Sequence, residues 1–243
     1  MDLTGKIALI TGGAKRVGKA ITQALAAKGC HLVVHYNTSQ TDAQATVQAL
    51  RAAGNEAIAL QADITKEDEV EHMIEAAVSH FGRIDVLVNN AALFYRTPVE
   101  TLTLEDWERV MDVNLTGTFL CAHKIGLRMR DWGWGHIINI ADVAGLRPWA
   151  DYIPYSVSKA CVLTFTQGLA MELAPHVMVN AVIPGPVLFQ EDTPDSVQQR
   201  ESDKTLVKRA GSPQDVAQVV VFVAESDYST GATFHVDGGR SLI

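Results

Sequence analysis

The feature that most constrains the fold is a regular alternation of short apolar runs with longer amphipathic segments. Seven runs have the length and continuous hydrophobicity of buried strands, and six segments between them carry apolar residues at helical spacing. Strands that alternate with helices form parallel sheets covered on both faces. The predicted strands are residues 6–11, 31–36, 57–62, 84–88, 136–141, 178–183 and 233–236. We therefore expect an α/β fold, with one doubly wound parallel sheet of seven strands.

The predicted helices fill the gaps between these strands. One follows the glycine-rich turn, with Val17, Ile21, Ala24 and Leu25 at helical spacing. The others cover about 41–54, 67–81, 104–130 and 213–225, and one contains Tyr155. Asn114 lies in the middle of 104–130, where asparagine is unfavourable, and it indicates a kink or a polar task. No repeat or linker divides the chain, so 1–243 is predicted to be a single domain. The polar stretch at about 186–210 is either a substrate lid or a surface loop.

Composition excludes several classes of protein. The net charge is −8 without a strongly basic stretch, which argues against a nucleic-acid partner. No apolar run is long enough to cross a bilayer, and no histidine pairs with Cys, Asp or Glu at a metal-ligand spacing. The three cysteines are scattered, as in a reduced cytosolic protein. We expect a cytoplasmic protein with a small-molecule substrate and no metal.

A glycine-rich turn follows the first predicted strand and leads into a helix. Gly12, Gly13 and Gly18 occupy it, and this layout places a pyrophosphate on a helix N-terminus. An ordinary tight turn is the alternative. The second strand ends in 35–39 without the acid that holds the ribose hydroxyl in NAD sites, while Lys15 and Arg16 could reach a 2′-phosphate. The pattern favours NADP(H) over NAD(H).

Tyr155 and Lys159 are one helical turn apart and share a helix face. A neighbouring ammonium lowers the pKa of a phenol, so the two side chains could form a proton-transfer pair. Asn90, Asp142 and Pro184-Gly185 follow other predicted strands. Because ligands of parallel sheets bind at the carboxyl ends of the strands, these residues are expected to share a site with the glycine-rich turn.

Together these motifs resemble the short-chain dehydrogenase/reductase family along essentially the whole chain. The matching residues are Thr11-Gly12 through Gly18, Asp63, Asn89-Asn90-Ala91, Asn114, Tyr155, Lys159, Pro184-Gly185 and Val236-Asp237-Gly238-Gly239. The resemblance implies a Rossmann-type domain, a nicotinamide cofactor and a homotetramer. It implies that Lys159 orients the nicotinamide ribose and that Asn114 holds a proton-relaying water.

Two departures from the family pattern resemble its pteridine reductase branch. Arg16 replaces a glycine of the turn, and Asp142 replaces the serine thirteen residues before the tyrosine. The His35-Tyr36 pair with Ser39, and Phe94-Tyr95, also match that branch. The resemblance implies that Phe94 stacks on a pterin and that Arg16 reaches both cofactor phosphate and pterin. Ala92 stands where the branch has a serine that contacts the pterin.

The candidate site residues follow from these motifs. The catalytic set is Asp142, Tyr155, Lys159 and Asn114; the substrate set is Arg16, Phe94, Asp142 and Tyr155; the cofactor set is Gly12, Lys15, Arg16, Val17, His35, Tyr36, Asn37, Ser39, Asp63, Ile64, Asn90, Ala91, Ala92, Tyr155, Lys159, Pro184, Gly185 and Val187. An ionised Asp142 would oppose formation of the phenolate and keep Tyr155 protonated, as a proton donor requires. A loop carboxylate that caps a turn is the alternative for Asp142.

The predicted function is NADPH-dependent reduction of a dihydropterin or dihydrofolate, with Tyr155 as proton donor. One alternative is a carbonyl reductase of the 3-oxoacyl-carrier-protein reductase or sugar/alcohol dehydrogenase type. Another is an NADP(H)-binding scaffold without catalysis. Phe94 is either a substrate-stacking ring or a core aromatic, and Trp149 lies either at the pocket mouth or in a subunit contact.

Overall fold

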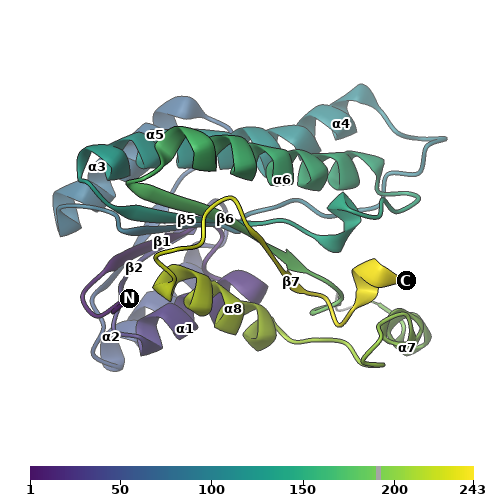
Figure 1. Cartoon of the computed structure of the whole chain (residues 1–243). Coiled ribbons are helices and arrows are strands. Elements are labelled where there is room, and N and C mark those ends of the chain that lie inside the picture. The colour runs from purple at the N-terminus through teal and green to yellow at the C-terminus, as the bar shows by residue number, and fades with distance from the viewer. Residues whose placement is uncertain (190–192) are drawn as a thin grey trace.

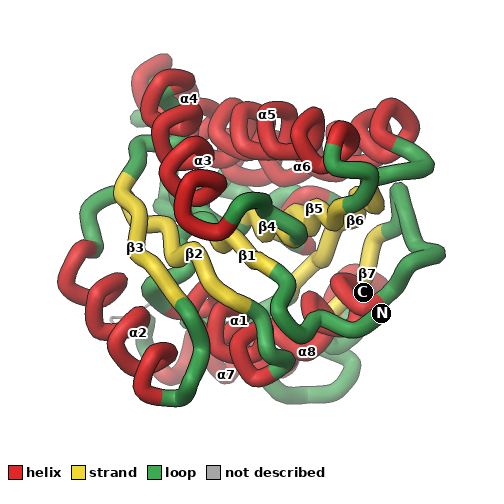
Figure 2. Tube along the Cα trace, turned by 90° about the vertical axis from the view of Figure 1, so that its left-hand side faces the viewer, coloured by secondary structure: helices red, strands yellow, loops and turns green. Residues whose placement is uncertain are grey.

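The computed structural model describes residues 1–189 and 193–243, and its centre is one parallel sheet of seven strands. The strands are β1 (Ile7–Ile10), β2 (His31–Tyr36), β3 (Ala57–Gln61), β4 (Val86–Asn89), β5 (Gly135–Ile140), β6 (Val177–Pro184) and β7 (Thr233–Val236). Their order is β3-β2-β1-β4-β5-β6-β7, which Figure 2 shows end-on. Strand order reverses between β1 and β4, so a crevice opens there at the carboxyl ends of the strands. The predicted fold class is confirmed.

The strands are apolar throughout because helices cover both faces of the sheet. In β1, Ala8 and Ile10 point into one core while Ile7 and Leu9 point into the other. All four side chains are buried, as the continuous apolar run predicts. Helices α1 (Arg16–Ala27), α2 (Gln40–Ala52) and α8 (Pro213–Glu225) lie on one face. Helices α3 (Glu67–Phe81), α5 (Gly117–Asp131) and α6 (Ile153–Leu173) lie on the other (Figure 1).

Local signals set several helix boundaries. Ser212 begins α8 with a capping box, in which its hydroxyl accepts from the Asp215 amide and the Asp215 carboxylate accepts from the Ser212 amide. Helix α3 ends at Gly82, whose φ of 85° suits glycine. The predicted bounds of α3 and α8 agree with the structure for this reason.

The predicted helix 104–130 is three segments. Helix α4 (Leu104–Met111) passes into a π-helical turn (Asp112–Thr116), and α5 follows. Asn114 lies inside the π-helical turn, so the regular helix is interrupted where the sequence predicts a kink or a polar task. A π-helical turn interrupts the regular hydrogen bonding of an α-helix, and such turns are frequent at functional sites.

The polar stretch after Pro186 contains a helix that the sequence analysis did not predict, α7 (Asp195–Asp203). None of its residues is buried, so it lacks the apolar periodicity that reveals a helix. Residues 190–192 of the predicted lid lie outside the described residues. Over the described parts of the chain, no helix is long and apolar enough to cross a membrane.

Candidate active site

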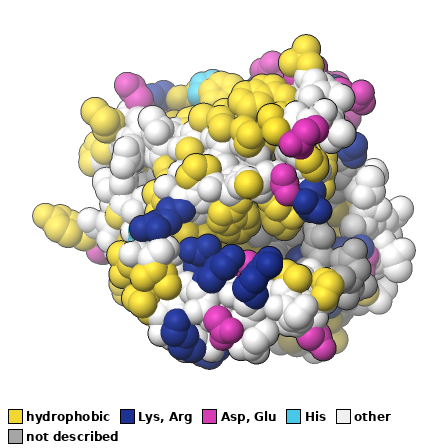
Figure 3. All heavy atoms as spheres, turned by 90° about the vertical axis from the view of Figure 1, so that its right-hand side faces the viewer, with side chains coloured by type: hydrophobic (Ala, Val, Ile, Leu, Met, Phe, Trp, Pro, Cys, Tyr) yellow, Lys and Arg dark blue, Asp and Glu magenta, His cyan; other side chains and the backbone are white. Residues whose placement is uncertain are grey.

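A cleft with a volume of ≈ 1530 Å³ opens at the carboxyl ends of the strands. Every predicted cofactor and substrate residue lines it, from Lys15 and Ser39 at one end to Phe94 and Tyr155 at the other. Of the predicted set, Asn114 alone does not line it among the residues that the structure describes. Figure 3 shows this face, on which dark blue Lys and Arg side chains gather around a hollow.

The glycine-rich turn is packed too closely for side chains. Gly12 has a φ of +62°, a conformation that disfavours other residues. A Cβ on Gly18 would lie 2.2 Å from the Gly12 carbonyl oxygen and 2.6 Å from Nδ2 of Asn90. The turn therefore leaves its backbone accessible at the N-terminus of α1, as pyrophosphate binding requires.

Two polar side chains from neighbouring strands hold this turn. His35 accepts the Gly12 amide at Nδ1 (3.0 Å) and donates from Nε2 to the Ala62 carbonyl (2.9 Å). Burial lowers the pKa of His35, which keeps the ring neutral and able to accept. Asn90 donates from Nδ2 to the Thr11 carbonyl at 2.9 Å. His35, a predicted cofactor residue, thus supports the turn through a buried side chain.

The residues around the turn fit a cofactor with an extra phosphate. Arg16 has a φ of 50° and is exposed at the start of α1, where its Nη2 lies 3.5 Å from the Leu188 carbonyl. Lys15 pairs with Asp42 at 2.8 Å. Both cations line the cleft beside Ser39, and the residues of β2 supply no acid there. This arrangement suits a 2′-phosphate better than a bare ribose hydroxyl.

The Tyr155 hydroxyl donates to Oδ2 of Asp142 at 3.0 Å. The other oxygen, Oδ1, accepts from the Ala144 amide at 2.7 Å and caps a short 3₁₀ turn (Val143–Gly145). Asp142 therefore both contacts Tyr155 and caps a turn, so each of its two interpretations describes one of its oxygens. Burial raises the pKa of Asp142 from 3.8 to about 6, although the Ala144 amide, Lys159 and Tyr155 oppose that shift.

The pKa of Tyr155 departs from our first expectation. Burial and the adjacent Asp142 raise it well above 10, whereas the sequence predicted that Lys159 would lower it. Lys159 lies 5.8 Å from the tyrosine ring centroid and donates its ammonium to the Ile140 carbonyl at 2.7 Å. Burial lowers the pKa of Lys159 to about 8 despite the attraction of Asp142. The expectation that Asp142 opposes the phenolate agrees with this shift.

Asn114 lies behind the cleft and holds the loop after β4. Its Oδ1 accepts from the Leu93 amide at 2.7 Å, and its Nδ2 donates to the Leu93 carbonyl and to the Ser158 hydroxyl, each at 3.1 Å. Ser158 in turn donates to the Tyr155 carbonyl at 2.7 Å. The π-helical turn thus links the loop before Phe94 to the helix that carries Tyr155.

Three aromatic rings form one wall of the cleft beside Tyr155. Phe94 stacks on Tyr152 with ring centroids 4.8 Å apart and an interplanar angle of 10°, and it meets Tyr155 edge-on at 4.8 Å. Trp149 packs edge-on against both Phe94 and Tyr152. Phe94 is 39% exposed, so it is not a core aromatic. Trp149 lines the cleft, as one of its two interpretations expected.

Sequence reasoning missed Tyr152 and the ion pair between Arg96 and Asp151 (2.5 Å). Tyr152 lies three residues before Tyr155, a helical spacing that could have placed it on the same side. Arg96 and Asp151 meet because Thr97 pairs with Tyr152 across an isolated β-bridge. The two segments are distant in sequence, so no local pattern predicts that contact. Among the residues that the structure describes, no cluster of His, Cys, Asp and Glu could hold a metal.

Comparisons with known proteins identify the family of this chain. Residues 12–241 match the family described as enoyl-(acyl carrier protein) reductase. A 3-oxoacyl-[acyl-carrier-protein] reductase of Synechocystis is 42% identical over 99% of this chain and 98% of its own. Glucose 1-dehydrogenase 2 of Bacillus subtilis is 35% identical over 99% and 95%. A blue fluorescent protein from a metagenomic library, solved with NADPH, is 35% identical over 99% of this chain and all of its own (100%), with a TM-score of 0.91.

The chain therefore belongs to the short-chain dehydrogenase/reductase family. It is an NADP(H)-dependent oxidoreductase, as the residues of the turn and of β2 predicted. The pteridine reductase branch is not singled out by these matches.

Proposed function

We propose that this enzyme reduces its substrate with Tyr155 as the proton donor. The observation that carries the proposal is the 3.0 Å hydrogen bond from the Tyr155 hydroxyl to Asp142 in the wall of the cleft. Bound NADPH supplies the hydride. Tyr155 gives its proton to the nitrogen or oxygen of the reduced double bond, and the raised pKa of Tyr155 ensures that the proton is present beforehand.

The other predicted catalytic residues would position Tyr155 and the cofactor. Lys159 is buried one helical turn beyond Tyr155, and its ammonium faces the end of β5, where it would hold the nicotinamide ribose. Asn114 fixes the loop before Phe94 and the backbone of α6, and a relay water there is part of the proposal. Lys15, Arg16 and the amides of the glycine-rich turn would hold the phosphates.

For the substrate, we propose a flat heterocycle of the dihydropterin or dihydrofolate type. The stacked rings of Phe94 and Tyr152 offer an aromatic wall beside the Tyr155 hydroxyl. Asp142, in place of the serine usual in this family, can bear a proton near neutral pH, since its pKa is about 6. Both features suit a substrate with ring nitrogens better than an isolated ketone.

A 3-oxoacyl thioester is the second candidate, and the names of the relatives support it better than they support a pterin. The glucose dehydrogenase likewise supports a sugar or alcohol as a third possibility. An NADP(H)-binding scaffold without catalysis is the remaining alternative, which the intact Tyr155 and Lys159 pair argues against.

The test measures NADPH consumption with dihydrobiopterin, dihydrofolate and an acetoacetyl thioester side by side. We expect turnover on the pterins, with a loss of ~10²-fold or more in Tyr155→Phe because the proton donor is removed. Asp142→Ala should also lower turnover, because the Tyr155 hydroxyl loses the carboxylate that accepts its hydrogen bond and orients it. The affinity for NADPH should change little. Tyr95→Phe is the control, since the Tyr95 hydroxyl lies 3.3 Å from Asp106 and outside the cleft lining.

Each outcome has one meaning. Turnover on the thioester alone would assign the enzyme to the carbonyl reductases. Binding of NADPH without turnover on any substrate would favour the scaffold. Unchanged turnover in Tyr155→Phe would contradict the proposed proton donor.

We further propose that 1–243 acts as one NADP(H)-binding domain with 186–210 as its lid, and that the protein is a cytoplasmic homotetramer. The lid is supported by its contribution to the cleft wall, which includes Leu188, Val197 and Lys204. The cytoplasmic location is supported by free thiols, since Cys30 and Cys121 are both buried and their pKa values are raised to about 12.

A further inference from the structure

The charges of the cleft are opposite to those of the molecule. The chain carries 20 Lys and Arg and 28 Asp and Glu, for a net charge of −8. Among the residues that the structure describes, eight of those basic side chains line the cleft, against four acidic ones. Lys15 and Arg16 belong to the cofactor end and Lys159 to the catalytic set. The remaining five are Arg96, Arg109, Arg200, Lys204 and Arg240, and Figure 3 shows dark blue Lys and Arg side chains gathered around the hollow on this face.

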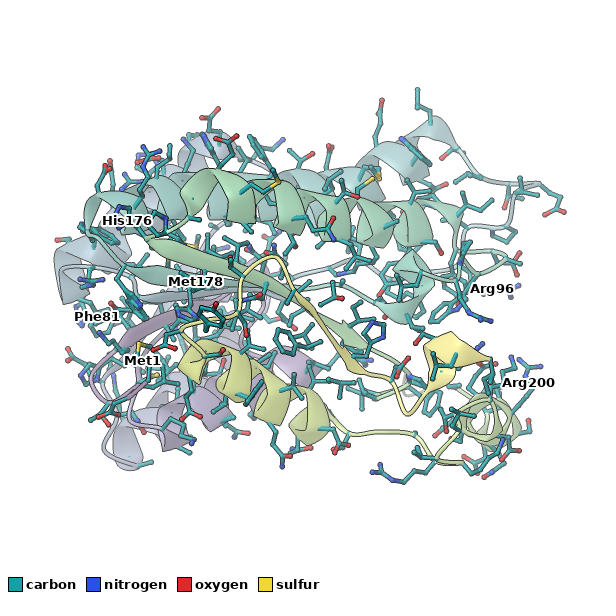
Figure 4. The ribbon with its side chains drawn as sticks, in the orientation of Figure 1. Met1, Phe81, Arg96, His176, Met178 and Arg200 are labelled. Atoms are coloured by element: carbon teal, nitrogen blue, oxygen red, sulfur yellow. The ribbon has the colours of Figure 1, made fainter. Side chains whose placement is uncertain are left out.

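Four of these five cations come from three segments that are distant in sequence. Arg96 lies in the loop after β4, Arg200 and Lys204 lie on and just after α7, and Arg240 begins the C-terminal 3₁₀ turn (Arg240–Leu242). The last two segments are joined, because the Leu206 amide donates to the Gly238 carbonyl at 2.8 Å. Figure 4 shows Arg96 and Arg200 at the same end of the molecule. We name Arg96, Arg200, Lys204 and Arg240 the cationic mouth.

The acids at the mouth neutralise only part of this charge. Arg96 pairs with Asp151 at 2.5 Å, and Glu201 is shared between Lys204 (2.7 Å) and Arg200 (3.5 Å). Arg240 donates to a backbone oxygen of Ile243 at 3.3 Å. The side chains of Arg96 and Arg200 are 67% and 66% exposed, so their guanidinium groups remain accessible to a ligand. The mouth therefore keeps an excess of positive charge where a substrate enters.

We propose that the cationic mouth binds an anionic tail of the substrate, carrying carboxylates or phosphates remote from the reacting double bond. This inference rests on the proposed reductase function and adds the charge of the substrate to it. The aromatic wall would take the flat reacting part, and the tail would extend past Trp149 toward α7. A cleft with cations on low-dielectric walls raises the local concentration of anions. The same chemistry is present in a glutamate tail and in the phosphates of a coenzyme thioester.

Matched substrate pairs test the proposal. Dihydrofolate is compared with its neutral glutamate diamide, and acetoacetyl-coenzyme A with the neutral acetoacetyl-N-acetylcysteamine. We expect a lower KM for the charged member of the accepted pair, and a KM that rises with salt for that member alone. The pair that is turned over identifies whether the tail is a carboxylate or a phosphate.

The variant Arg200→Gln/Lys204→Gln/Arg240→Gln removes three charges from the mouth. Each exposed ion pair changes affinity by roughly twofold to fivefold, so we expect KM for the charged substrate to rise by roughly tenfold. The KM for the neutral member, kcat and the Kd for NADPH should stay within about twofold. The control Lys28→Gln/Arg51→Gln/Arg130→Gln removes the same charge outside the cleft lining and should leave all four constants unchanged.

Three results would overturn the inference. The first is equal KM values within both pairs, and the second is an equal rise in KM for charged and neutral substrates in the variant. The third is a variant in which NADPH binds more weakly while KM for the charged substrate is unchanged. Binding of folate and of its diamide to the enzyme with NADP⁺, measured by quenching of tryptophan fluorescence, is independent of turnover. A preference for folate over its diamide without turnover would contradict the proposed function and support the anion site. Turnover without any preference for the charged member would support the proposed function and contradict the anion site.

Discussion

The two oxygens of Asp142 have different partners. One caps the turn after β5, and the other accepts the proton of Tyr155. A serine at this position has one oxygen and could not make both contacts as a charged acceptor. The residue therefore couples the shape of the loop to the protonation of the catalytic tyrosine.

This coupling predicts how reduction depends on pH. An ionised Asp142 opposes the phenolate that forms when Tyr155 gives up its proton, and a protonated Asp142 does not. Since the pKa of Asp142 is about 6, kcat for reduction should rise as pH falls through that value. In Asp142→Ser this rise should be absent from the pH profile of kcat. A profile with the same rise in that variant would assign the titration to another group.

His35 offers a second prediction at this scale. The amide of Gln matches the Nε2 position of the ring and leaves no acceptor at the Nδ1 position. The Gly12 amide would then be unpaired, which costs about 1 to 3 kcal/mol. We expect the Kd of NADPH to rise roughly tenfold in His35→Gln, measured by calorimetry. His80→Gln is the control. His80 is exposed and pairs with Glu56, which precedes β3 at the amino end of the strand, opposite the end that forms the cleft. Equal affinity in the two variants would show that the turn does not depend on His35.

At the scale of elements, local signals determine what could be predicted from sequence. The bounds of α3 and α8 agree because a helix-ending glycine and a capping box each act within a few residues. The sequence did not predict the π-helical turn at 112–116 or helix α7. The first depends on Leu93 and Ser158, which are distant in sequence from Asn114, and the second has no apolar face.

The candidate site divides in the same way. The glycine-rich turn and the pair of Tyr155 and Lys159 are local motifs, and the cleft brings them together. The stacking of Phe94 on Tyr152 and the ion pair of Arg96 with Asp151 join two loops, so they depend on the fold of the whole sheet edge. The spacing of Tyr155 and Lys159 predicts the wrong direction for the pKa of Tyr155, because burial raises that pKa and cannot be read from a spacing.

Two glycines in helices provide a matched test of packing. Gly18 lies in α1 against the Gly12 carbonyl, whereas a Cβ on Gly168 in α6 would meet no heavy atom within 4 Å. Gly18→Ala should abolish NADPH binding or lower the thermal midpoint by several degrees. Gly168→Ala should stabilise the protein by about 0.5 to 1 kcal/mol, because alanine favours the helix. The midpoints from thermal denaturation, with and without NADPH, distinguish the two effects. Similar loss in both variants would contradict the close approach at Gly18.

For the whole molecule, the exposed apolar side chains bear on assembly. Phe222 on α8 is 58% exposed and meets Phe234 of β7 edge-on, and Tyr228, between α8 and β7 in the chain, is 97% exposed. Strand β7 is the last strand of the sheet, so its outer edge is open to a partner. These features support a contact between copies of the chain at this edge.

We therefore predict a tetramer with a mass of about four times 26.3 kDa in light scattering. Phe222→Arg should shift the protein to dimers or monomers, because a charge would be buried in the contact. The control Met171→Arg alters a side chain that is 82% accessible on α6, which lies on the opposite face of the sheet from α8 (Figure 1). A monomer in the unaltered protein would refute the prediction, and an unchanged tetramer in Phe222→Arg would move the contact elsewhere.

The π-helical turn also limits how this chain can evolve. Its extra residue acts as a spacer, so deleting one position from 112–116 would rotate α4 relative to α5 by about 100°. Val110, buried on α4 against Tyr155, would then turn away from the active site, and Asn114 would lose its reach to Leu93. Insertions in the loop before α4 are free of this constraint. Length variation among functional descendants should therefore accumulate around 98–103 and spare the spacer.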